Sequence, residues 1–338
     1  MKQNKIIYIA IAILISSWSI AQERGLPIFK DYLNDNWYLI HPSMAGASNY
    51  DKVRVTGRRS WFDVDDAPNL QTVNANFRVG EKVGLGGAFF NDENGRFSQI
   101  GGYLSFAYHL SLTNDSSILN QLSFGTSVNL IEESLDETDI NTINNPDPVI
   151  FGVEQSDLFF NFDVGLSYNY KDYFVHGTVR NIIAQDRTIF TEIFENDNQR
   201  QYLLSTGYNY YIGEESPWSL QPSVMFQYRE FTEETNLDIN GKVFYNTDFG
   251  YIWGGLSYRR SFDGAEFLSD GNSIETQKLN NISPFIGINY KNFIFAYMYT
   301  YQTDNIVLSN SGFHQITLGY NINKRRKKYD CNCPAVNY

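Results

Sequence analysis

Residues 159–181 have the sequence FFNFDVGLSYNYKDYFVHGTVRN, in which large apolar and small or polar residues alternate. A spacing of two puts alternate side chains on opposite faces of a β-strand. The dipeptide Lys171-Asp172 joins this run to a second one, which predicts an antiparallel hairpin. A soluble sheet buries its apolar face in a core, whereas a membrane barrel turns that face to lipid and keeps the polar face for the lumen. The rest of the chain decides between the two.

The alternation recurs from Tyr50 to residue 322 and predicts about fourteen strands. A strand that crosses a bilayer at a tilt needs about 9–11 residues, whereas strands of soluble sheets are usually nearer 5–6. Most of the runs have the membrane length, which favours a transmembrane antiparallel β-barrel. The runs are about 50–61, 69–79, 83–91, 98–112, 120–131, 159–170, 173–181, 201–211, 218–230, 236–245, 249–261, 280–290, 293–301 and 313–322.

The connections between these runs are alternately long and short. Residues 132–158 and 182–200 are long connections, whereas 171–172 and 291–292 are two-residue turns. Bacterial outer-membrane barrels have short periplasmic turns and long extracellular loops. An even strand count then returns the carboxyl terminus to the periplasm, so we predict that both termini are periplasmic.

The composition agrees with an all-β membrane barrel. Aromatic residues make up 16% of the 338 residues, and the four charged types only 19%. The mean hydropathy of −0.36 is compatible with a barrel, because only alternate strand residues face lipid and the loops are wet. The formal net charge of −12 disfavours nucleic acid as a partner.

Residues 1–21 have the pattern of a signal peptide. Lys2 and Lys5 precede the apolar run 6–15, and Ser19-Ile20-Ala21 is a small-x-small cleavage site. The apolar run is too short to span a bilayer comfortably, which disfavours an uncleaved anchor. We therefore predict an exported protein of the outer membrane of a Gram-negative bacterium.

Residues 22–49 lack the alternation and are interrupted by Pro and Gly. We predict a periplasmic segment that packs on the barrel, which occupies 50–322.

In the strand at 83–91, Gly84-Leu85-Gly86-Gly87 is no phosphate loop because no helix follows it. Glycines inside a strand mark a bend or the close approach of another chain segment.

No local signature of catalysis is present, and we predict no enzymatic activity and no cofactor. His109 and His176 fall on the inward parity near Ser105 and Thr178, which leaves a barrel hydrolase as a weak alternative. Calcium held by loop acids is a further hypothesis, although their spacing matches no dedicated calcium loop. Those acids are Glu132, Glu133, Asp136, Glu137, Asp139, Asp147, Glu154, Asp157, Glu192, Glu195 and Asp197.

The tail 323–338 contains five consecutive basic residues, Lys324-Arg325-Arg326-Lys327-Lys328, followed by Cys331 and Cys333. The basic run can hold this end at an anionic surface or dock an acidic periplasmic partner, and both interpretations stay open. Two cysteines alone form no disulfide framework and cannot complete a zinc site.

Several short motifs resemble the PorP/SprF family of type IX secretion system outer-membrane proteins of the Bacteroidetes. The family's amino-terminal pattern is like Leu-Asn-Pro-Ala-x-Ala-Gly, where this chain has Ile40-His41-Pro42-Ser43-Met44-Ala45-Gly46, with departures at His41 and Ser43. The other motifs occur in the family's order and cover nearly the whole mature chain. They are Arg58-Arg59-Ser60-Trp61, Val83-Gly84-Leu85-Gly86, Asn91-Asp92-Glu93-Asn94-Gly95, Ala107-Tyr108-His109-Leu110 and Leu122-Ser123-Phe124-Gly125.

The resemblance implies a non-enzymatic accessory barrel of a secretion and gliding machinery. It implies two kinds of partner: a large secreted adhesin-like client with a carboxy-terminal signal domain, and periplasmic components of the same system. A passive channel or small-molecule transporter is the alternative, because the predicted lumen is polar. The residues that we expect to contact partners are Trp37, Tyr38, Pro42, Gly46, Lys324, Arg325 and Arg326.

Overall fold

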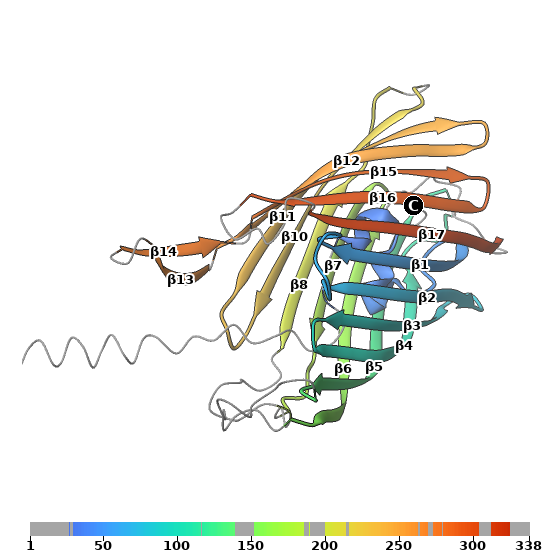
Figure 1. Cartoon of the computed structure of the whole chain (residues 1–338). Coiled ribbons are helices and arrows are strands. Elements are labelled where there is room, and N and C mark those ends of the chain that lie inside the picture. The colour runs from blue at the N-terminus through green and yellow to red at the C-terminus, as the bar shows by residue number, and fades with distance from the viewer. Residues whose placement is uncertain are drawn as a thin grey trace, which may run out of the picture.

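The structure is a computed structural model of the whole chain, and its wall is one closed antiparallel sheet (Figure 1). It describes residues 27, 30–115, 117–138, 152–185, 189, 200–213, 216–262, 264–269, 273–278, 280–303 and 312–324. Within these ranges, no helix is long and apolar enough to cross a bilayer.

The wall contains fourteen strands, as predicted, because β8 and the two-residue β9 both pair with β10 and together form one strand interrupted at Asn209. Pairing of β10 with β11 and of β1 with β17 closes the barrel. The strands are β1 (Tyr50–Ser60), β2 (Asn69–Val79), β3 (Val83–Asn94), β4 (Phe97–Ser111), β5 (Asn120–Asp136), β6 (Glu154–Tyr170), β7 (Tyr173–Arg180), β8 (Gln201–Tyr208), β9 (Tyr210–Tyr211), β10 (Trp218–Arg229), β11 (Thr235–Thr247), β12 (Gly250–Ser261), β15 (Asn281–Tyr290), β16 (Phe293–Gln302) and β17 (Phe313–Lys324).

The alternation sorts side chains between lipid and lumen. The polar side chains of β6 at 161, 163, 167 and 169 are at most 3% exposed, whereas Phe160, Val164, Leu166 and Tyr170 are 41–47% exposed. A face this apolar belongs in lipid, and the buried parity then lines the inside. The parity deduced from the sequence is therefore confirmed.

The connections divide the barrel into two ends. The short-turn end carries the connections 80–82, 112–119, 171–172, 212–217, 248–249 and 291–292, and the long-loop end carries all the others. Lys171 and Lys291, at φ 51° and 56°, make the two-residue turns in the left-handed region.

Three differences from the predicted strands occur at the long-loop end. The strand β3 continues to Asn94, which leaves a connection of only two residues, 95–96, before β4. The strands β5 and β6 pair as far as Asp136 and Glu154, beyond the apolar alternation, because a hydrogen-bonded ladder continues wherever both backbones stay extended. The connection after β12 contains a separate hairpin, β13 (Gly264–Ser269) and β14 (Ser273–Lys278), which projects from the wall (Figure 1).

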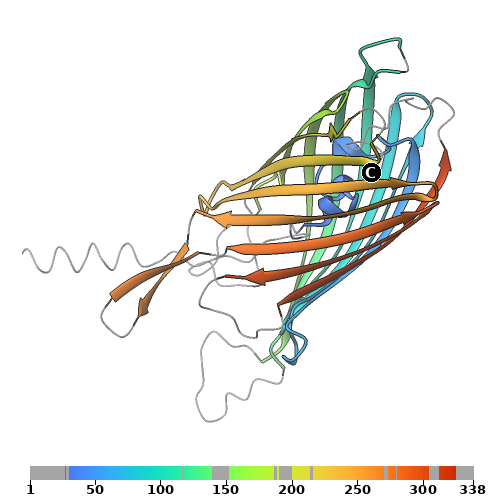
Figure 2. The same cartoon turned by 90° about the horizontal axis from the view of Figure 1, so that it is seen from above.

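Residues 30–49, here called the plug, lie inside the barrel (Figures 1 and 2). The plug contains three single turns of 3₁₀-helix, η1 (Asp31–Asn34), η2 (Trp37–Leu39) and η3 (Pro42–Met44). All of its residues are buried except Leu39, which is half-buried. The sequence predicts packing on the barrel but not this position in the lumen, and the predicted periplasmic location stays a prediction.

Leu104, in the middle of β4, is 74% exposed and tests the lipid-facing parity. We expect Leu104→Arg to destabilise the barrel in lipid by roughly 2–4 kcal/mol, since that is the cost of a cation near the bilayer midplane. Folding into vesicles, followed by the heat-sensitive mobility of the folded band in cold SDS electrophoresis, measures it. Leu104→Val serves as the control, and equal folding of the Arg variant would show that Leu104 does not face lipid.

Candidate functional site

The plug makes many polar contacts with the wall, and the first group surrounds Asp238 of β11. This buried carboxylate accepts from Lys30 Nζ at 3.0 Å, from Tyr32 Oη at 2.9 Å and from Arg259 Nε of β12 at 2.7 Å. Lys30 Nζ also donates to Ser257 of β12 at 2.7 Å. One acid thus pairs with two cations out of water, where an unpaired charge is costly.

A second carboxylate, Asp35 of the plug, faces β1. It lies 2.6 Å from Lys52 Nζ and 2.7 Å from Arg54 Nη2. Asp35 ends η1 in the left-handed region at φ 64°, a conformation that Asp adopts more readily than most residues. The turn therefore aims its carboxylate at β1.

Hydroxyl and imidazole contacts hold the middle of the plug. Tyr38 Oη lies 3.0 Å from Ser105 Oγ of β4. His41 Nδ1 lies 2.8 Å from Thr178 Oγ1 of β7, and its Nε2 lies 2.9 Å from Ser205 Oγ of β8. Burial, reinforced by nearby His176 and Arg180, holds the pKa of His41 well below 6.5. The ring is therefore neutral, with one nitrogen donating and the other accepting.

Glycines of the wall receive the backbone of the plug. A Cβ on Gly84 of β3 would lie 1.9 Å from the Ala45 carbonyl oxygen, and one on Gly125 of β5 would lie 2.2 Å from the Ser43 nitrogen. A Cβ on Gly86 would lie 2.5 Å from the Tyr38 ring. Such distances exclude any side chain, so the close approach expected at the β3 glycines is confirmed for Gly84 and Gly86.

An apolar cluster covers the other side of the plug. Trp37 packs edge-on against Phe174 of β7, with ring centroids 5.2 Å apart, and tilted against Tyr32 at 4.8 Å. The lumen of this half of the wall is therefore a hydrophobic core. The cluster comprises Tyr32, Leu33, Trp37, Ile40, Met44 and Ala47 of the plug with Leu119, Phe174, Leu203, Met225, Phe244, Tyr251, Trp253, Phe285, Ile294, Ala296 and Met298.

These contacts run across the barrel. Tyr38 reaches β4, whereas Lys30 reaches β11 and β12, which lie opposite β4 in the order of strands around the wall. Lys30 binds β11 and β12 near their long-loop ends. The Gly46 carbonyl oxygen accepts from Arg78, and the Gly46 N–H donates to Asn76, both near the short-turn end of β2. The plug thus crosses the lumen obliquely from one end toward the other.

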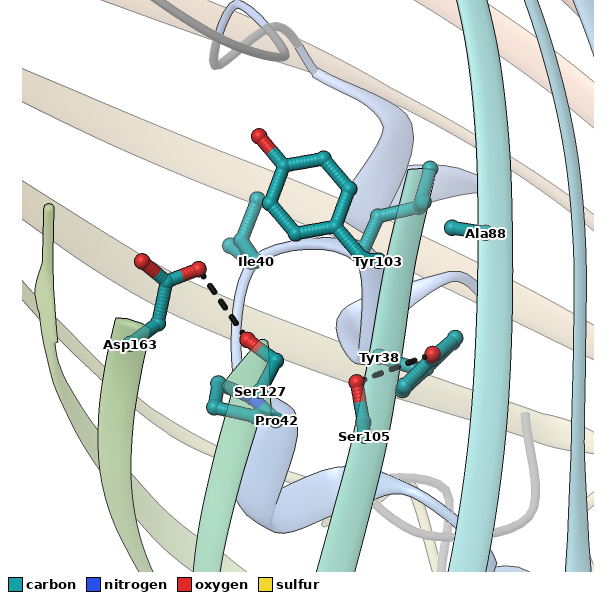
Figure 3. A pocket seen from close by; sticks show the side chains of 9 residues that line it. Tyr38, Ile40, Pro42, Ala88, Tyr103, Ser105, Ser127 and Asp163 are labelled. Carbon is teal, nitrogen blue, oxygen red and sulfur yellow. Dashed lines mark hydrogen bonds between the residues drawn. The ribbon is translucent and has the colours of Figure 1, made fainter. Parts of the chain in front are cut away.

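A small pocket remains between the plug and β3–β6, beside Asp163 (Figure 3). The Asp163 carboxylate accepts from Ser127 Oγ at 3.1 Å and from the Asn181 backbone N–H at 3.0 Å, and Arg180 Nε lies 3.7 Å away. The charge of Asp163 is therefore already compensated by these groups. We interpret the pocket as part of the wall surface that supports the plug. Its lining is Tyr38, Leu39, Ile40, Pro42, Ala88, Tyr103, Ser105, Ser127 and Asp163.

The residues expected to contact partners fall into two groups. Trp37, Tyr38, Pro42 and Gly46 lie together in the plug and are buried against the wall. Lys324 ends β17, and Arg325 and Arg326 lie outside the described residues, as do Cys331 and Cys333. Partner binding by any of these residues stays a prediction.

The histidines considered for a hydrolase occupy separate places. His109 Nε2 donates to the Ala45 carbonyl oxygen at 2.9 Å while Nδ1 lies 2.8 Å from Ser123 Oγ. His176 packs edge-on against Trp37 of the plug, with ring centroids 5.4 Å apart. Each ring thus supports the plug. Five of the eleven acids raised for calcium lie outside the described residues, and that hypothesis stays untested.

Sequence reasoning did not single out Lys30, Asp35, Arg54, Asp238 or Arg259. Their signal was available in part, because Arg54, Asp238 and Arg259 are charged residues on the lumen parity of β1, β11 and β12. A charge there needs a partner.

The family model described as type IX secretion system membrane protein PorP/SprF matches residues 21–320. The chain belongs to the PorP/SprF family. None of the curated proteins compared with it matches. The family membership and the lipid-facing barrel together make the chain an outer-membrane component of type IX secretion.

Solved structures of outer-membrane barrels are similar in fold alone. The CymD monoaromatic hydrocarbon channel has a TM-score of 0.48 at 11% identity, over 86% of this chain and 93% of that one. BamA from Haemophilus ducreyi lacking POTRA domains 1–3 gives 0.40 at 8%, over 81% and 70%. CdiB from Acinetobacter baumannii gives 0.38 at 8%, over 80% of this chain and 60% of its own length.

Four of the six motifs on which the resemblance rests meet in space. Residues 40–46 form the part of the plug that lies on Gly84 and Gly125, which come from two other motifs. His109, from a fourth motif, bonds Ala45. Motifs that are far apart in the sequence are therefore one structural unit.

Gly84 and Gly87 provide a matched test within β3. We expect Gly84→Ala to destabilise the barrel by about 1–3 kcal/mol, because the new methyl overlaps the Ala45 carbonyl oxygen. Gly87→Ala should change stability by less than about 0.5 kcal/mol, since the nearest atoms would be 3.8 Å away. Denaturant unfolding in detergent measures both, and equal losses would contradict docking on Gly84.

Proposed function

We propose that this barrel helps to secrete, or to anchor at the cell surface, a large adhesin-like client with a carboxy-terminal signal domain. In this role it also contacts periplasmic components of the type IX secretion and gliding machinery. The proposal rests on membership of the PorP/SprF family. The orientation that fits it places the short turns and both termini in the periplasm and the long loops outside.

The plug supports a binding role rather than conduction through the lumen. It crosses from β4 to β11 and β12, and its apolar residues share a core with the wall. Moving it aside would expose that core and remove Asp35, the acid that pairs with the buried cations Lys52 and Arg54, which is unfavourable. Partners are then best bound at the two ends of the barrel.

The ends differ in the chemistry that they offer. The long-loop end carries the acidic residues named above, including Glu154 and Asp157. Binding of calcium by these acids is part of the proposal. The opposite end receives the basic run that begins at Lys324, which suits an acidic periplasmic partner. Trp37 and Tyr38 are buried against the wall, so they can bind a partner only if the plug moves.

Gentle detergent extraction and pull-down test the proposal. Purification of the tagged barrel from outer membranes should recover a large secreted protein together with periplasmic secretion components. Deletion of the gene should deplete that protein from the cell surface. A second tagged outer-membrane barrel of the same cells is the control. Recovery of the barrel alone, with normal surface display of every secreted adhesin after deletion, would contradict the proposal.

A passive channel is the second candidate, because the lumen wall carries many polar side chains. We expect the intact chain to give no steady conductance in planar bilayers, since the plug crosses the lumen. A chain lacking residues 30–45 provides the comparison and should conduct if its band in cold SDS electrophoresis shows that it folds. Steady conductance by the intact chain would favour the channel.

A further inference from the structure

The ladder between β1 and β17 differs from every other ladder of the wall. It joins the first and last strands, pairing residues such as Val55 with Leu318, whereas the other ladders join strands that are adjacent along the wall's chain order. Closing it requires the whole intervening chain to be in place, at a larger loop-closure entropy than any hairpin. We call this ladder the closing seam.

Arg54 lies across the closing seam. Its Nη2 donates to Asn321 Oδ1 of β17 at 2.8 Å, and its Nη1 lies 3.4 Å from the Tyr320 carbonyl oxygen. The Arg54 side chain runs over Gly319, its partner in the ladder, where a Cβ would be 2.7 Å from Arg54 Cδ. The absence of a side chain at Gly319 is what lets the guanidinium reach β17.

The plug holds this arginine from the lumen. Asp35 Oδ2 accepts from the same Arg54 Nη2 at 2.7 Å, while its Oδ1 accepts from Lys52. The plug also meets β17 directly, where Gln315 Nε2 donates to Asp31 Oδ1 at 3.2 Å. Asp35 precedes Arg54 by only 19 residues, so plug and β1 can form a local unit before β17 arrives.

We propose that the plug acts as an internal clasp for barrel closure. Asp35 neutralises and orients Arg54, and the fixed guanidinium then captures Asn321 and the backbone of β17. Without Asp35, Arg54 and Lys52 are two buried cations that repel each other and have no acid between them. Plug docking and closure of the seam are therefore one cooperative event.

The charge-only variant Asp35→Asn tests the clasp, with Asp238→Asn as the matched control. Both remove one carboxylate that joins plug and wall, but Asp238 lies on β11 and pairs with Lys30 of the plug and Arg259 of β12, away from the closing seam. Each is combined with a seam disulfide between Val55→Cys and Leu318→Cys, which are partners in the ladder, in a chain whose Cys331 and Cys333 are replaced by Ser. The readout is the temperature at which the compact band disappears in SDS electrophoresis.

We expect Asp35→Asn to lower that temperature and the oxidised seam disulfide to restore it. Asp238→Asn should not be restored, because its defect lies elsewhere. The clasp is wrong if the disulfide fails to rescue Asp35→Asn, or if it rescues both variants equally.

A second pair of variants covers the case in which Asp35→Asn does not fold. Gly319→Ala displaces the Arg54 side chain without altering any charge and should reproduce the loss and its rescue. Gly57→Ala, in β1 of the same seam, has no atom within 4 Å of the new methyl and should behave like the parent. Equal behaviour of the two alanine variants would also overturn the proposal.

Discussion

The constraint on which this structure depends is that lipid cannot hydrogen-bond a peptide backbone. Every N–H and C=O in the bilayer must find a partner within the chain, and for a chain built of strands only a closed cylinder achieves this. Closure in turn imposes alternation, with one parity against lipid and the other inside. The features of the interior, including its charges and its plug, follow from that second parity.

An interior wall that is part polar and part apolar has to be either hydrated or filled. Here it is filled, and the plug matches each part of the wall with its own chemistry. Trp37 meets the apolar arc at Phe174, whereas Asp35 and Lys30 meet charges of opposite sign on β1 and β11. The plug needs little regular structure of its own, because the wall supplies the hydrogen bonds and the core that short 3₁₀ turns lack.

Sequence alone predicted the wall well, because period-two alternation is a local signal that fourteen strands repeat. It failed where partners are remote. The parity places Asp238 in the lumen, but nothing local connects it to Lys30, which lies 208 residues earlier. The β3 glycines predict that another segment approaches closely, but the sequence does not identify Ala45 as part of that segment. The last residues of β5, 132–136, were not predicted, because alternation ends where the outward side chains no longer need to be apolar.

The position of the family motifs bears on function. Pro42 begins η3, Gly46 follows it at φ 63°, and the wall glycines accept the backbone between them. Together these residues seat the plug against the wall and so specify a filled interior. A filled interior fits the proposal that partners bind at the two ends of the barrel rather than inside it.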